Sequence, residues 1–137
     1  MSFAELFADA EIIHAYTRAQ ALEDGTLVDA GPAAREAGFR MPVALTQAAW
    51  VDCVAWTDAD NKRKGTWQDE PGRLWDVLWM AFHAARRAGG RQRVPFDLVR
   101  VPVVGRGVTA RKVTLALMIG PGDEGEPVIT IGLPHED

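Results

Sequence analysis

The chain has 137 residues, of which 47% are hydrophobic, enough for one domain, residues 1–137, around a buried core. Nineteen acidic against fifteen basic residues leave a formal net charge of −4, the wrong sign for a surface that binds nucleic acid. The single cysteine excludes an internal disulfide and a multi-cysteine zinc site and suits a reducing compartment, so we expect a cytoplasmic protein.

The first residues do not have the pattern of a targeting segment. They contain three acids and no basic stretch, unlike a secretory signal, and no apolar run in the chain is long enough to span a bilayer. We therefore expect no membrane association. Residues 3–10, with Phe3, Leu6 and Phe7 on one face, predict a short amphipathic helix that packs on the domain as an arm.

Residues 14–29 predict a short helix between two strand ends. Thr17 and Gln20 have the spacing of a capping box, so the helix should begin at Arg18, and Gly25 can end it in the left-handed conformation. A helix of about two turns is marginal in water, so neighbouring elements must hold it in place.

Two more helices are predicted before residue 57. A Gly-Pro pair at residues 31–32 precedes one helical turn over residues 33–37, which a glycine ends. Thr46 then caps a helix over residues 47–56, within which Cys53 is interpreted as a small buried hydrophobe. The apolar stripe of this helix consists of Ala48, Val51 and Ala55, widened by Trp50 and Val54.

Residues 57–72 are predicted as a long polar loop, a kind of segment that is uncommon unless it is mobile or functional. A calcium site is disfavoured, because Arg63 and Asp69 stand where a calcium loop needs glycine and glutamate. Lys62 and Arg63 belong to a dense basic run that either forms a binding surface or is a solvated tip. Trp67, among these charges, either anchors an interface or folds back onto the core.

The strongest helical periodicity lies in residues 73–88, which we predict to be the central core helix. Its apolar row is Leu74, Leu78, Ala81 and Ala85, with Trp75, Trp79 and Phe82 beside it. Strands follow at residues 96–104, 113–119 and 128–131, and the last two are joined by a loop over residues 120–127. The fold class is therefore α+β: a Trp-rich helix on a mainly antiparallel sheet that ends in a β-hairpin, with short helices in the amino-terminal half.

Two stretches, YTRAQALEDGTLVD at residues 16–29 and GPGDEGEPVITI at residues 120–131, support a family resemblance. Through them the chain resembles a family of small uncharacterised bacterial proteins that are often carried on phages and plasmids. The resemblance implies a mobile-element context. It implies no catalytic residues.

A second resemblance supports an enzymatic alternative. His14, Tyr16 and the short alanine-rich helix after them look like the opening of ADP-ribosyltransferase-like folds. In such folds a histidine at a strand end holds the nicotinamide ribose of NAD, and a glutamate on a late strand polarises a ribose hydroxyl. Glu126 is the matching glutamate here, although it lacks the usual context.

We expect a non-enzymatic protein-binding module from a mobile element, with a host protein as its partner and no cofactor; NAD belongs only to the alternative. The candidate binding residues are Trp67, Lys62, Arg63, Arg18 and Asp123, of which Asp123 otherwise serves a hairpin turn. No metal site is predicted, because the three histidines are too dispersed. A homo-oligomer joined through residues 96–104 is a third option.

Overall fold

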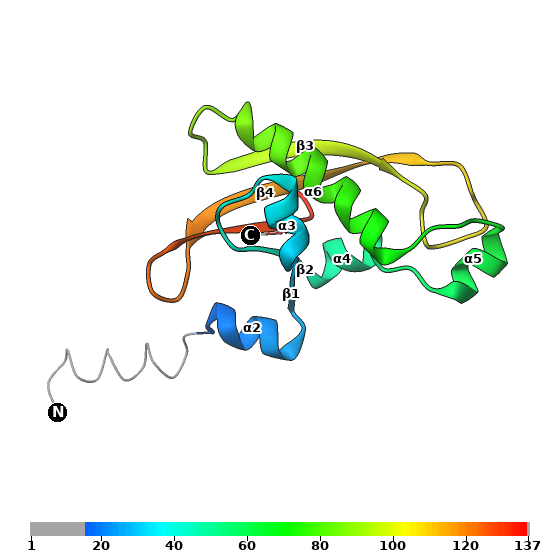
Figure 1. The fold of residues 1–137 in the computed structure, drawn as a ribbon, viewed down its shortest axis with the longest axis horizontal. Coiled ribbons are helices and arrows are strands. Elements are labelled where there is room, and N and C mark those ends of the chain that lie inside the picture. Colours follow the sequence, from blue (N-terminus) through cyan, green and yellow to red (C-terminus); the bar gives the residue numbers. More distant parts are fainter. Residues whose placement is uncertain (1–15, 137) are drawn as a thin grey trace, which may run out of the picture.

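The computed structural model describes residues 16–136. Figure 1 shows α6 lying along one layer of strands, with α2 apart from it near the β4–β5 turn. The described part contains five helices and five strands, in the order α2 Arg18–Asp24, β1 Leu27–Asp29, α3 Pro32–Ala37, β2 Val43–Thr46, α4 Gln47–Cys53, α5 Asp58–Lys64, α6 Glu70–Arg86, β3 Arg93–Arg100, β4 Arg111–Pro121 and β5 Pro127–Gly132. The helix predicted over residues 3–10 lies outside the described residues, and so does His14.

The strands form one sheet in the order β1-β2-β5-β4-β3, in which only the β2–β5 pair is parallel. Leu117 of β4 lies between Val94 of β3 and Ile131 of β5, and this row of apolar side chains faces the helices. The prediction of an α+β fold with a mainly antiparallel sheet and a carboxy-terminal hairpin is confirmed.

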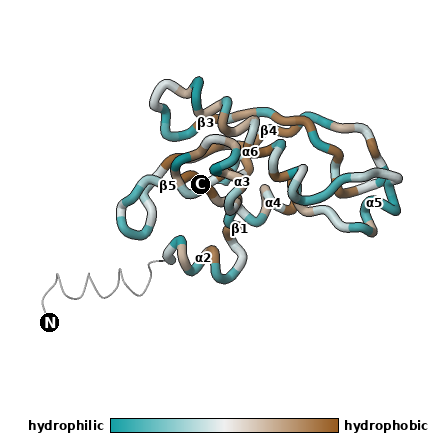
Figure 2. The backbone as a smooth tube through the Cα atoms, viewed as in Figure 1, coloured by the Kyte–Doolittle hydropathy of each residue, from teal (hydrophilic) through white to brown (hydrophobic). Residues whose placement is uncertain are grey.

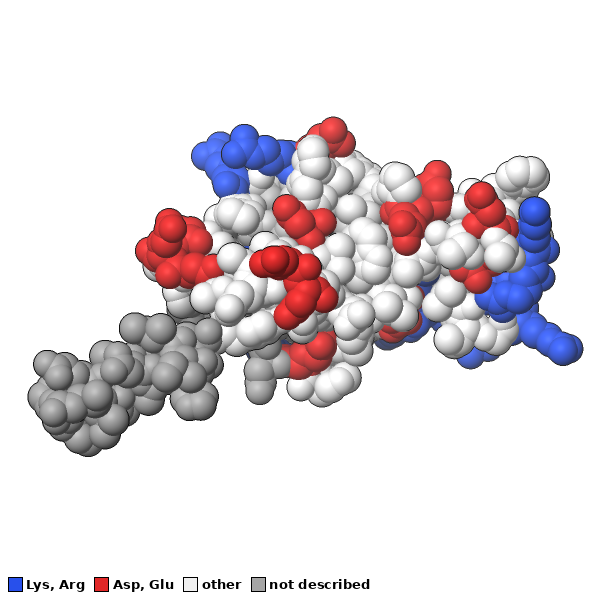
Figure 3. Space-filling model, turned by 90° about the horizontal axis from the view of Figure 1, so that it is seen from below, with Lys and Arg blue, Asp and Glu red and all other residues white. Residues whose placement is uncertain are grey.

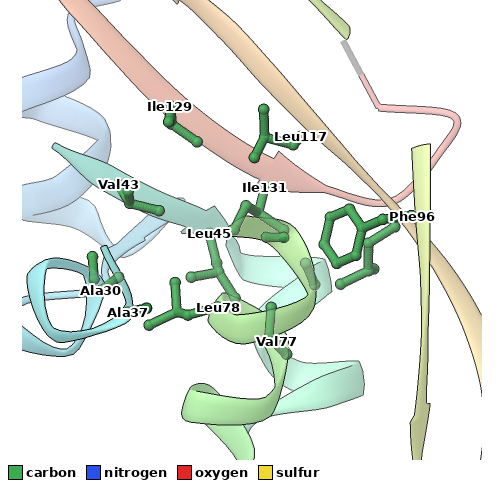
Figure 4. Packing of buried hydrophobic residues seen from close by; sticks show 14 of the residues in the cluster. Ala30, Ala37, Val43, Leu45, Val77, Leu78, Phe96, Leu117, Ile129 and Ile131 are labelled. Atoms are coloured by element: carbon green, nitrogen blue, oxygen red, sulfur yellow. The ribbon is translucent and has the colours of Figure 1, made fainter. Parts of the chain in front are cut away.

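Helix α6 is the main helix of the core, as its periodicity predicts. Figure 4 shows Val77 and Leu78 of α6 facing Leu45 and Ile131 of the sheet, and all four side chains are fully buried. Hydrophobic residues gather along β4 and α6, whereas hydrophilic residues gather at α5 and at the β4–β5 turn (Figure 2). Within residues 16–136, no helix combines the length and apolar composition needed to cross a membrane.

The aromatic residues of α6 are less buried than predicted. Trp79 is 46% exposed, and Trp75 and Phe82 are half-buried on the flank of the helix. The row that faces the sheet runs through residues 74, 77, 78, 81 and 84, and one helical residue turns the side chain by about 100°, which places residues 75 and 79 to the side. Phe82 packs over Gly38, where an added Cβ would lie 2.7 Å from the phenyl ring.

Helix α4 begins as predicted but buries a different face. Thr46 caps it by accepting the Ala49 N–H at 3.1 Å, yet the helix ends at Cys53 and not at residue 56. Ala49 and Cys53 are buried, whereas Ala48 and Val51 of the predicted stripe are exposed. The prediction chose the wrong face of the helix, because alanines lie on both faces of this two-turn helix and do not indicate which face is buried.

The prediction of a loop over residues 57–72 is wrong for most of its length. Residues 58–64 form α5, whose start is fixed by a capping box between Thr57 and Asp60 and whose end is fixed by Gly65 at a φ of 65°. Helix α6 then begins at residue 70 and not at 73. A polar helix of seven residues has no apolar periodicity, so its caps are the only signal in the sequence.

The interpretation of Cys53 as a buried hydrophobe is confirmed, and it predicts low thiol reactivity. Burial, with a smaller contribution from the nearby Asp52 carboxylate, raises the pKa of the Cys53 thiol to about 11. At pH 8 the reactive thiolate should therefore be scarcer than in a free cysteine by about two orders of magnitude. We expect alkylation by iodoacetamide, followed by mass spectrometry, to be slow in the native protein and rapid in urea; rapid native labelling would contradict the burial.

Candidate functional site

The start of α2 is capped by a carboxylate from the opposite end of the chain. Asp123, in the turn between β4 and β5, accepts the Arg18 N–H at 2.7 Å and the Ala19 N–H at 3.0 Å. Thr17 accepts the Gln20 N–H at 3.0 Å and so completes the predicted capping box. The free N–H groups of this helix start are thus paired, and the negative charge lies at the positive end of the helix dipole.

The Arg18 side chain forms a second link between the same two segments. Its guanidinium donates to Thr130 Oγ1 at 2.7 Å and to the Ile129 carbonyl at 2.8 Å, both on β5. Partial burial lowers the pKa of Arg18, and the carboxylate of Asp123 opposes that shift. Arg18 and Asp123, predicted as binding residues, therefore join the two stretches that carry the family resemblance.

Tyr16 takes part in a hydrogen-bonded group on the surface of this corner. Its hydroxyl donates to Asp24 and lies 3.0 Å from Thr26 Oγ1, while the Thr26 hydroxyl donates to Asp24 at 2.6 Å. The Thr26 hydroxyl, followed by that of Tyr16, lowers the pKa of the Asp24 carboxyl, and Asp24 in turn raises the pKa of Tyr16. The hydrogen-bonding partners of the Tyr16 hydroxyl therefore belong to the same segment, residues 16–26.

A cleft of about 470 Å³ lies at this corner, between α2 and the β4–β5 turn. Tyr16, Arg18 and Asp123 line it. Glu126 does not, because its carboxylate folds back onto its own turn and accepts the Glu124 N–H at 3.0 Å. Of the three residues predicted for NAD chemistry, the structure places Tyr16 in the cleft and Glu126 beside it.

The other candidate surface lies at the α5 end of the molecule, where Trp67 is 99% exposed. Trp67 belongs to the segment between α5 and α6, and beside it is a shallow hollow of about 520 Å³ that Lys62 and Thr66 help to line. Among the candidate binding residues, Trp67 and Lys62 thus lie together on one exposed surface.

Asn61 holds the segment that carries Trp67. Its side-chain oxygen accepts from Trp56 Nε1 at 2.8 Å, from the Thr66 hydroxyl at 2.9 Å and from the Gln68 N–H at 2.8 Å. Its amide nitrogen donates to the Gln68 carbonyl at 2.8 Å. The residues on both sides of Trp67 are hydrogen-bonded to the side chain of Asn61. The backbone that carries the exposed indole is therefore held in place.

Side chains in the last turn of α5 donate hydrogen bonds to the loop that follows β3. Arg63 donates to the carbonyls of Gly105 at 2.5 Å and Val103 at 2.8 Å, and it pairs with Asp60 at 2.9 Å. Lys64 is buried, and its ammonium donates to the carbonyls of Gly107 at 2.7 Å, Val104 at 3.3 Å and Pro102; burial lowers its pKa. Lys62 and Arg63 were both predicted as binding residues. Arg63 is bonded within the protein, whereas the Lys62 ammonium makes no hydrogen bond or ion pair within residues 16–136.

Comparison with known proteins gives one match. Residues 3–137 match the model of a family described as a family of unknown function, DUF6573. The chain belongs to this family. No curated protein and no solved structure matches it. Membership of the DUF6573 family supports the resemblance to uncharacterised proteins and assigns no reaction, so the function of the chain must be argued from its geometry.

Sequence reasoning missed two contacts that shape these surfaces. Nothing in the spacing of Arg18 and Asp123 indicates that they meet, and only their positions in the two stretches resembling the family set them apart. Asn61 appears in the sequence as one polar residue among many, and its signal was the capping box that makes its segment helical. Within residues 16–136, no group of three or more potential metal-ligating side chains is arranged for a metal.

The cap on α2 predicts a measurable loss of stability. Replacing Asp123 by alanine removes the acceptor of two backbone N–H groups, so we expect the free energy of unfolding to fall by about 0.5–2 kcal/mol, as for other helix N-caps. Urea denaturation measures this change. Glu124→Ala, in the same turn, is the matched control and should shift the free energy by less than about 0.5 kcal/mol. Equal effects of the two substitutions would mean that the cap contributes little.

Proposed function

We propose that this chain is a non-enzymatic protein-binding module that contacts its partner through Trp67 and Lys62. The observation that carries the proposal is the full exposure of Trp67 on a segment fixed by Asn61. Tryptophan is usually well buried in a monomer and is enriched among the residues that dominate interface energies. A rigid support reduces the entropy that would be lost when a partner covers the indole.

The surface around Trp67 carries charged groups that a partner could pair with. Figure 3 shows blue side chains at the end of the molecule that carries α5, with red side chains beside them, and Lys62 and Arg63 are exposed there. The hollow beside Trp67 is lined by one carboxylate, that of Asp58, and one ammonium, that of Lys62, so its charges balance. A partner with an apolar pocket for the indole and an acidic residue opposite Lys62 would complement it in shape and charge.

The identity of the partner rests on the family resemblance. Because the chain resembles proteins that are often carried on phages and plasmids, we propose that the partner is a cytoplasmic protein of the bacterial host and that the chain is an accessory protein of a mobile element. A host partner also suits the surfaces found within residues 16–136, since occupying a host protein requires a surface and no reaction.

The proposal predicts that Trp67→Ala separates binding from stability. An indole that is 99% exposed buries no apolar area within the chain, so the free energy of unfolding should change by less than about 0.5 kcal/mol. Capture of a host protein from lysate, quantified by mass spectrometry, should fall by at least about 30-fold, as expected for an interface hot spot. Val51→Ala, which also trims an exposed apolar side chain, is the control and should retain the partner.

Two results would contradict this function. A loss of more than about 1 kcal/mol in Trp67→Ala would mean that the indole packs within the chain. Unchanged capture by the variant would place the contact elsewhere.

The alternative is an ADP-ribosyltransferase-like enzyme that uses NAD, and it has less support. Tyr16 and Arg18 do line one cleft, but Glu126 bonds to its own turn and lies in the segment before β5, not in the strand. If this alternative were correct, the purified chain would transfer label from NAD to a protein, and Glu126→Ala would abolish the transfer. We expect no transfer by the unaltered chain, as measured by autoradiography.

A further inference from the structure

Strand β3 forms a long free edge of the sheet. The sheet order places β1 and β3 at its two edges, and β1 has three residues whereas β3 has eight. Short edge strands offer few backbone groups to another chain, but long ones are templates for pairing. The edge that matters is therefore β3, residues Arg93–Arg100.

The register shows which backbone groups of β3 point outward. The Ile119 N–H donates to the Gln92 carbonyl at 2.8 Å, so the even-numbered residues of β3 bond to β4 and the odd-numbered ones face away from it. Pro95 has no N–H to offer. Asp97 and Val99 are left with outward N–H and C=O groups, and neither N–H donates to a side chain within residues 16–136.

Exposed apolar side chains lie beside this edge. A cleft of about 510 Å³ separates the middle of α6 from β3, and Trp79, Met80 and Val99 line it and are all exposed. An exposed tryptophan next to exposed backbone groups is typical of a surface that another strand covers.

We propose that β3 pairs antiparallel with β3 of a second copy of this chain, about a twofold axis at Leu98. The two sheets then become one continuous sheet. Each copy donates its Asp97 and Val99 N–H groups to the Val99 and Asp97 carbonyls of the other copy. This surface is distinct from the one around Trp67, so the inference does not depend on the proposed function.

The positions of the free N–H groups of β3 favour a twofold axis at Leu98 over an axis at a nearby residue. An axis at Asp97 sets two carboxylates directly opposite each other, and an axis at Phe96 sets Pro95, which has no N–H, against Asp97 of the second copy. An axis at Val99 would require the Val101 carbonyl, which already accepts from Arg73 at 3.0 Å. The axis at Leu98 pairs the N–H groups of Asp97 and Val99 with carbonyls that accept from no other group within residues 16–136.

The side chains are compatible with the same register. Asp97 would lie opposite the uncharged Val99 of the second copy, with Lys112 of that copy next along the row, since Lys112 pairs with Val99 across β4. Asp97 already pairs with Lys112 of its own copy at 3.9 Å, so its charge is balanced within each chain, and no like charges lie directly opposite each other. Leu98 of the two copies would meet at the axis, beside the exposed Trp79 of each α6.

Sedimentation equilibrium of the full chain tests the proposal. We expect the mass to rise with concentration from one chain, 15.0 kDa, toward twice that value. Val99→Pro removes one outward N–H from each copy without touching the β3–β4 hydrogen bonds, so it should raise the dissociation constant by about tenfold or more. Val99→Ala keeps the N–H and is the matched control; it should weaken the dimer less. A melting curve of each variant checks that it folds.

A cross-link tests the register. In a Cys53→Ala background, Leu98→Cys should give a disulfide-linked dimer on mild oxidation, because residues at a non-hydrogen-bonded antiparallel pair lie about 4.5 Å apart, within disulfide reach. A single-chain mass at every concentration overturns the proposal. So does a dimer that Val99→Pro leaves intact, one that Trp67→Ala dissolves, or one that fails to cross-link at position 98.

Discussion

The contact that joins the beginning of the described chain to its last hairpin is the carboxylate of Asp123 at the start of α2. Helix α2 has seven residues and cannot be stable alone, so its position is set by what binds its ends. Asp123 binds its first N–H groups, and Arg18 of the same helix binds β5 through Thr130 and Ile129. Because these bonds connect segments more than one hundred residues apart in sequence, they join the beginning of the described chain to its last hairpin. The cleft beside them is a consequence of this joint.

At the α5 end, in contrast, polar side chains are buried and bind the backbone of a loop. Here a buried Lys64 ammonium is surrounded by backbone carbonyls, and the Asn61 side-chain amide makes four hydrogen bonds. Burying a cation is costly unless acceptors surround it, so Lys64 fixes the loop over residues 101–107 against α5. These bonds order a polar region that has little buried apolar area of its own, and within it the side chains of Trp67 and Val104 are exposed.

Sequence patterns predicted the elements whose signal is local or strongly periodic. The capping box at Thr17 and the cap at Thr46 belong to this group, and both are confirmed. The strand β4 is also confirmed, but its predicted alternation is not, because residues 115–117 are all buried. Errors arose where several residues could satisfy one pattern, as with the alanines of α4, or where polar contacts replaced apolar ones, as in α5. Residues 101–104 were assigned to a strand on composition, but Lys64 and Arg73 draw their carbonyls away from the sheet. Such contacts depend on the tertiary fold and leave no spacing in the sequence.

The two proposed surfaces are linked through one loop. Strand β3 ends at Arg100, and the residues that follow it at once are those that Arg63 and Lys64 hold against α5. A second copy bound along β3 would therefore brace the strand that leads into the support of Trp67. Self-pairing would also present two copies of the Trp67 surface on one particle, and a partner with two matching sites would then bind the pair more tightly than a single copy without any new contact. The dimer is thus a means by which a small exposed surface around one tryptophan could reach a useful affinity.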